Sequence, residues 1–283
     1  MSNLRESYAR LAEGRSIYFS QQGDGEPFLF VHMSTGSADN AQGMFGILRD
    51  RFHCIALDRA GYRYSGTLDR LTTMEEQVAA IAAVHDACTA EPAWVFGHSG
   101  GGTWSVAYAL AHPDRVRGLI LYEPALYGVF PPEGRPPGVS TMIETVAPVF
   151  RAGPLHKALS QFSRALNPEL SPQAADERAT ENLSSDRRAG CESFATEMSV
   201  VVTWSPMPGQ WAQLTQPALV MAGDCTGEAL PEIAAKVAER LPNGELAILE
   251  GQHHGAPMAA PDVLAQRTVA FIDRVVAAES KDG

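Results

Sequence analysis

The sequence predicts an α/β protein with a mostly parallel sheet that helices cover on both faces. Short apolar segments alternate along the chain with longer segments of helical periodicity, and turn residues separate them. A further observation is the run Gly-His-Ser-Gly-Gly at 97–101, which lies between an apolar segment and a helix-forming one. This strand–turn–helix context is typical of a serine, here Ser99, that is exposed on a sharp turn.

Each expected strand is a short apolar segment that ends at a turn or a polar residue. These strands are expected at residues 16–19, 28–31, 54–57, 93–96, 118–122, 217–223 and 245–249. Residues 54–57 are uniformly apolar, as in a parallel strand that is buried on both faces. Val78, Ile81 and Val84 recur at helical spacing and predict a helix over 75–90. Further helices are expected at 103–110 and 261–276.

The alternation of strands and helices breaks between residues 126 and 212. A segment rich in proline and glycine at 131–138 predicts a hinge. After it, Leu155, Leu159 and Phe162 recur at helical spacing. We therefore expect a helical insert at 126–212, within a core formed by 1–125 and 213–283.

The composition is typical of a globular enzyme domain. The chain has 283 residues, of which 45% are hydrophobic and 19% charged, and its net charge is −11. A negative surface repels phosphate backbones and anionic lipids, so nucleic-acid and membrane partners are not expected. Residues 1–7 lack an apolar signal region, and we expect a cytoplasmic protein that acts on a small-molecule substrate. Homo-oligomerisation is left open.

The cysteines predict no metal site and no disulfide framework. They are widely spaced and form no Cys-x-x-Cys pair: Cys54, Cys88, Cys191 and Cys225. Nothing in the sequence implies a metal or an organic cofactor.

Ser99 needs two partners before it can act as a nucleophile. A serine hydroxyl is a weak nucleophile, so it requires a base, and the base requires an acid that orients it. In proteins with this turn, the acid and then the histidine follow the serine along the chain. Asp224 ends the expected strand at 217–223, and His254 follows the expected strand at 245–249. The sequence thus supplies both partners in the required order.

Three further segments make the chain resemble the α/β-hydrolase fold superfamily over nearly its whole length. Residues 28–32, Phe-Leu-Phe-Val-His, resemble the family's third strand and the start of its oxyanion turn. Residues 57–65 resemble the Asp-x-x-Gly-x-x-x-Ser segment after the fourth strand, and residues 111–116 resemble the end of the helix after the nucleophile. The resemblance implies a sheet of the eight-stranded type and a helical cap formed by the insert. One departure is Met33, which stands where the family usually has glycine.

The resemblance also implies the roles of the site residues. Ser99 is the expected nucleophile, His254 the base and Asp224 the acid that orients it. The oxyanion is expected to meet the backbone N–H groups of Gly100 and Ser34. Met33 is the alternative to Ser34 as the second donor.

Two of these assignments have alternatives. His253 adjoins His254, and adjacent residues of an extended segment point in opposite directions, so only one of them reaches Ser99. The spacing from Gly251 favours His254. Glu123, which follows the expected strand at 118–122, is the alternative acid, because some members of the family carry it there.

The expected activity is hydrolysis of a carboxylic ester or lactone of a small-to-medium apolar substrate. Ser99 argues against epoxide hydrolases and haloalkane dehalogenases, which use a carboxylate at this position. The alternatives are a hydrolase of carbon–carbon bonds and a cofactor-independent oxygenase that uses the pair of histidine and acid. A ligand receptor without catalytic activity is a third hypothesis, since fold alone does not fix function.

Overall fold

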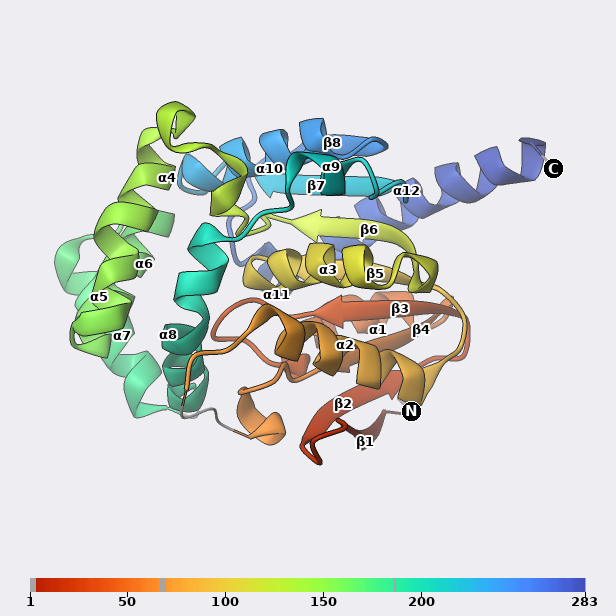
Figure 1. Cartoon of the computed structure of the whole chain (residues 1–283), viewed down its shortest axis with the longest axis horizontal. Helices are drawn as coiled ribbons and strands as arrows, with labels where there is room; N and C mark the ends of the chain where they lie inside the picture. Colours follow the sequence, from red (N-terminus) through yellow and green to blue (C-terminus); the bar gives the residue numbers. More distant parts are fainter. Residues whose placement is uncertain (1–3, 67–69, 186, 283) are drawn as a thin grey trace.

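An eight-stranded sheet forms the centre of the structure (Figure 1). The computed structural model describes residues 4–66, 70–185 and 187–282. The strands are β1 (Arg5–Arg10), β2 (Ser16–Gln22), β3 (Glu26–Val31), β4 (Phe52–Leu57), β5 (Ala93–His98), β6 (Val116–Tyr122), β7 (Ala218–Gly223) and β8 (Gly244–Leu249). Their order in the sheet is β1-β2-β4-β3-β5-β6-β7-β8. Strands β3 to β8 run parallel, while β1 and β2 are antiparallel to their neighbours, so the predicted fold class is confirmed.

Strand β1 was not among the predicted strands. Its sequence, Arg-Glu-Ser-Tyr-Ala-Arg, has no apolar alternation, and only Ala9 in it is buried. It pairs with β2 along its whole length, from Arg5 opposite Gln21 to Arg10 opposite Ser16. Backbone pairing at the sheet edge therefore forms this strand, and a periodicity of side chains does not reveal it.

Helices cover both faces of the sheet. The helices of the core are α1 (Gln42–Leu48), α2 (Met74–Cys88), α3 (Gly100–Ala111), α10 (Ala229–Arg240), α11 (Ala256–Ala259) and α12 (Pro261–Asp282). The apolar side chains of α2, α3 and α10 pack on one face of the sheet. Those of α1 and α12 pack on the other. Among the described residues no helix, not even α12, is long and apolar enough to span a membrane.

The chain between β6 and β7 is helical. It contains α4 (Pro137–Thr141), α5 (Ala147–Ala152), α6 (Leu155–Leu166), α7 (Pro172–Ser184), α8 (Arg188–Thr203) and α9 (Pro208–Trp211). Helices α4 to α8 gather beyond the carboxyl ends of the parallel strands, at the left of Figure 1. Buried side chains of these helices belong to the same apolar cluster as those of α2 and α3. We call residues 126–212 the helical insert.

Candidate active site

Ser99 lies at the sharp turn between β5 and α3. Its backbone angles, φ 53° and ψ −121°, are unusual for a residue other than glycine. Three backbone hydrogen bonds hold this conformation. The N–H of Ser99 donates to the carbonyl of Tyr122, and its own carbonyl accepts from Gly102 and Ala125. The Ser99 side chain is therefore carried on a strained turn that its neighbours fix.

Glycine at position 101 permits the helix to approach the strand at this turn. A Cβ atom on Gly101 would lie 2.1 Å from the carbonyl oxygen of Val31 and 2.6 Å from that of His32. These oxygens belong to the end of β3 and the residue after it, so α3 begins almost in contact with that strand end. The close approach brings the N-terminus of α3 next to the loop that carries Ser34.

His254 pairs with Glu123. The Nδ1 atom of His254 lies 2.5 Å from Oε2 of Glu123, and the Glu123 side chain is fully buried. The other carboxylate oxygen, Oε1, accepts from the N–H of Gly223 at 3.0 Å. Glu123 follows β6 with φ 44°, a conformation rare for this residue type. With Nδ1–H donated to the carboxylate, Nε2 of His254 is left as the free basic nitrogen.

Asp224, the acid expected from the sequence, does not lie against His254. Its Oδ1 accepts from the backbone N–H of Gly251 at 2.7 Å and contacts the thiol of Cys225. The side chain is exposed at the carboxyl end of β7. The structure thus does not bring Asp224 and His254 together. β6 and β7 are neighbours in the sheet, and the carboxylate that contacts His254 is that of Glu123, directly after β6.

His253 points away from the site. It is exposed, and its Nδ1 lies 2.6 Å from the carbonyl oxygen of Cys225. Of the two adjacent histidines, His254 is thus the one that contacts a buried carboxylate. The hydroxyl of Tyr122, the last residue of β6, donates to the carbonyl of His253 at 2.6 Å. This hydrogen bond attaches the loop after β8 to the end of β6.

His98 holds the loop that carries His254 from the other side. Its Nε2 lies 2.9 Å from the carbonyl oxygen of His254, so the Nε2–H donates to that oxygen. The centroids of the His98 and His254 rings are 4.9 Å apart. Burial lowers the pKa of His98 well below its usual value, and His254 lowers it further. Sequence analysis gave His98 no part in this site, although its place beside Ser99 was a usable signal.

Ser34, one of the two expected oxyanion donors, lies in the turn after β3 and next to the other, Gly100. A Cβ atom on Gly100 would lie 3.5 Å from the backbone nitrogen of Ser34, which places the two peptides side by side. Gly100 is the first residue of α3, so its N–H has no partner within the helix. Met33, the alternative donor, uses its carbonyl oxygen to accept from Nδ1 of His32 at 2.7 Å.

His32 fixes this turn as a neutral imidazole. Its Nε2 accepts from the N–H of Arg59 at 3.0 Å, so the proton resides on Nδ1. Burial lowers the pKa of His32 well below its usual value, and the nearby Arg59 charge acts in the same direction. Residue 32 therefore joins the oxyanion turn to the loop after β4.

The sequence of this chain matches a known family. A family model described as "alpha/beta hydrolase fold" matches residues 26–256. The chain belongs to the α/β-hydrolase fold family. The resemblance predicted from the sequence is confirmed at the level of the family and its fold.

Individual relatives in the family differ in activity. The chain is 34% identical over 126 residues to a proline iminopeptidase of Neisseria gonorrhoeae, a match that covers 42% of this chain and 39% of that protein. It is 22% identical to (E)-2-((N-methylformamido)methylene)succinate hydrolase of Acinetobacter baylyi, over 93% of this chain and 97% of that one. An esterase from Exiguobacterium antarcticum superposes with a TM-score of 0.75 at 16% identity, over 94% and 99% of the two chains. The last match concerns the fold alone.

Proposed function

We propose that this protein is a serine hydrolase that cleaves a carboxylic ester or lactone of a small-to-medium apolar substrate. The observation that carries the proposal is the pair of Nδ1 of His254 and the buried carboxylate of Glu123, at the strand ends beside a strained serine turn. In a catalytic triad the histidine takes the proton of the serine, and the carboxylate orients the histidine. In this proposal Glu123 takes the place that the sequence analysis gave to Asp224.

The proposed reaction proceeds through an acyl-enzyme. Ser99 Oγ attacks the carbonyl carbon while its proton passes to Nε2 of His254. The negative charge that forms on the carbonyl oxygen is stabilised by the N–H groups of Gly100 and Ser34. The bond to the alcohol oxygen then breaks, and His254 returns the proton to that oxygen. Water attacks the acyl group in the same way and releases the carboxylic acid and free Ser99.

Glu123 has two functions in this scheme. Its carboxylate orients the ring of His254 so that Nε2 is the free nitrogen, and it stabilises the imidazolium that forms during the attack. The second oxygen is held by the N–H of Gly223, so the carboxylate cannot rotate away from the histidine. The fixed carboxylate supports Glu123 as the acid of the triad.

The helical insert serves as the cap of this site. Helices α4 to α8 lie beyond the carboxyl ends of the strands, which is where Ser99, Glu123 and His254 are carried (Figure 1). In open parallel sheets the substrate binds at this end. The full-length relative from Acinetobacter baylyi hydrolyses a small organic molecule, which supports a substrate of limited size.

The proposal is tested by hydrolysis of p-nitrophenyl acetate and a γ-lactone by the wild type and by Ser99→Ala. We expect Ser99→Ala to lower kcat/KM by about 10³-fold or more, because it removes the nucleophile. Circular dichroism provides the control for folding. Activity of Ser99→Ala within tenfold of the wild type would contradict the triad. Dioxygen consumption by Ser99→Ala would instead favour the oxygenase, and turnover restricted to vinylogous diketones would favour the carbon–carbon hydrolase.

A further inference from the structure

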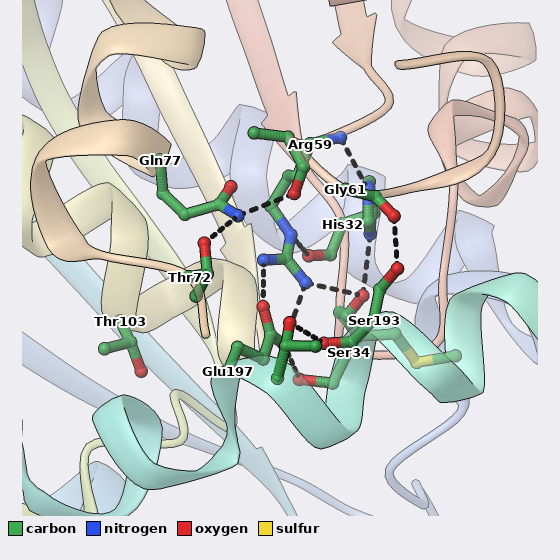
Figure 2. A network of polar contacts seen from close by, with 12 residues as sticks. His32, Ser34, Arg59, Gly61, Thr72, Gln77, Thr103, Ser193 and Glu197 are labelled. Carbon is green, nitrogen blue, oxygen red and sulfur yellow. Dashed lines mark hydrogen bonds and ion pairs between the residues drawn. The ribbon is translucent and has the colours of Figure 1, made fainter. Parts of the chain in front are cut away.

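A buried ion pair joins helix α8 of the insert to the core. Nη1 of Arg59 lies 2.6 Å from Oε2 of Glu197, and Nη2 lies 3.1 Å from Oε1 (Figure 2). The two side chains are 0% and 1% exposed. Burial alone would lower the pKa of Arg59, but the Glu197 carboxylate beside it raises the pKa above its usual value. Two charges without solvent are costly to bury, so this pair depends on its geometry and on its further hydrogen bonds.

Three further hydrogen bonds of the pair go to the oxyanion turn, residues 32–34 after β3. Nε of Arg59 donates to the carbonyl of His32 at 3.1 Å, and Nη2 donates to that of Met33 at 3.4 Å. The hydroxyl of Ser34 donates to Oε1 of Glu197 at 2.6 Å. The ion pair therefore contacts three consecutive residues of the turn, of which His32 and Ser34 are labelled in Figure 2.

One side of α8 docks on the core loops and thereby fixes Glu197. A Cβ atom on Gly190 would lie 3.2 Å from the carbonyl oxygen of Thr35, so the helix backbone nearly touches the turn. The hydroxyl of Ser193 donates to the carbonyl of Gly61. Positions 190, 193 and 197 fall on one face of a helix. Glu197 is thus presented to Ser34 by a helix that is anchored beside the turn on the same face.

The hydrogen bond to Glu197 also decides which atoms of Ser34 can serve the reaction. The hydroxyl proton is donated to a carboxylate, so the hydroxyl cannot at the same time donate to a substrate. The backbone N–H of Ser34 is left as the donor. Oε1 of Glu197 would lie 3.6 Å from a Cβ atom on Gly100, so its charge is close to the proposed oxyanion. An unpaired carboxylate there would repel the oxyanion, and the Arg59 charge offsets that repulsion.

We propose that Glu197 is a positioning residue that holds the backbone N–H of Ser34 in the direction of the oxyanion through the Ser34 hydroxyl, with Arg59 as its counter-charge. This inference rests on the proposed function. A cap helix, and not the core alone, then completes the oxyanion hole. The contribution appears in the transition state, where the charge forms, and leaves substrate affinity largely unaffected.

The test uses Ser34→Ala, which removes the hydroxyl but keeps the backbone N–H and the ion pair. We expect kcat for p-nitrophenyl acetate to fall about tenfold with KM within about twofold, less than the 10²–10³ for loss of a whole donor. The rate of Ser99 labelling by a small fluorophosphonate should fall by a similar factor, since the phosphoryl oxygen uses the same donors. Glu197→Gln should also lower kcat, as Ser34→Ala does. Glu192→Gln is the matched control, because Glu192 lies on the same helix in an exposed pair with Arg188.

The outcomes separate this inference from the proposed function. If the fluorophosphonate does not label wild-type Ser99, the proposed function itself fails. If the wild type is labelled and Ser34→Ala keeps kcat and the labelling rate within twofold, the inference is overturned while the function stands. A raised KM with unchanged kcat also overturns it, because that result assigns Ser34 to substrate binding. Glu197→Gln leaves the Arg59 charge buried without its partner, which can prevent folding. If Glu197→Gln does not fold, the result with Ser34→Ala alone decides the test.

Discussion

At the scale of single residues, the acids that end β6 and β7 have different partners. Glu123 is buried against Nδ1 of His254, while the exposed Asp224 accepts from the backbone N–H of Gly251. Glu123→Gln should lower kcat/KM for ester hydrolysis by about 10³–10⁴-fold, because an amide cannot stabilise the imidazolium. Asp224→Asn should stay within about tenfold of the wild type, because an amide oxygen still accepts from Gly251. Steady-state kinetics of the two variants measure both effects.

An equal loss in the two variants would contradict this assignment. The matched folding control is the thermal midpoint of each variant, since Asp224→Asn changes only an exposed contact. A loss of activity in Asp224→Asn alone would show that Asp224, after β7, is the acid of the triad.

The sequence points to Ser99 and His254 as candidates because each has a local signal. Ser99 lies in a glycine-rich turn between a strand and a helix, and His254 follows the last strand. The choice between Glu123 and Asp224 has no such signal, since both are carboxylates that end buried strands next to each other in the sheet. Only the folded structure shows which side chain contacts His254. It is that of Glu123, whose unusual φ the sequence does not reveal.

Glu197 was missed for a different reason. In the sequence it lies in an amphipathic segment next to Met198, where a glutamate is usually exposed. A usable signal was the face formed by Gly190, Ser193 and Glu197, whose small and polar side chains allow close packing. Its partner Arg59 lies 138 positions away, so the contact arises only in the folded chain.

At the scale of elements, the contact between β3 and α3 limits substitution at Gly101. Gly101→Ala should lower the free energy of unfolding by about 1–3 kcal/mol, because the new Cβ meets the carbonyl oxygen of Val31 at 2.1 Å. The matched control is Gly46→Ala in α1, where no atom lies within 4 Å of the new Cβ. That change should raise the stability by about 0.5–1 kcal/mol through helix propensity. Urea unfolding measures both, and a neutral Gly101→Ala would argue against the close approach.

At the scale of the whole molecule, buried neutral histidines should make the stability depend on pH. Burial lowers the pKa of both His32 and His98 in the folded state. Unfolding releases them to a pKa of about 6.5, so below that pH the unfolded chain binds protons that the folded chain does not. Their stabilising effect is complete above about pH 6.5 and declines as the pH falls. The thermal midpoint should therefore decrease between about pH 7 and pH 5.

His98→Gln is the variant that tests this source of pH dependence. Glutamine keeps a side-chain N–H for the carbonyl of His254 but does not titrate. The rings that face His98 are those of His254 and Tyr122. We expect a shallower dependence of the thermal midpoint on pH in His98→Gln than in the wild type. Parallel curves for the two proteins would show that His98 is not a source of the effect.

The measurement that tests the central claim most directly is the intact mass of the wild-type protein after exposure to a small fluorophosphonate, followed by peptide mapping. The central claim is that the pair of His254 and Glu123 activates Ser99. We predict a single adduct on Ser99, formed much more slowly in Glu123→Gln than in Asp224→Asn. No adduct on folded wild-type protein, or an adduct on another residue, would contradict the claim.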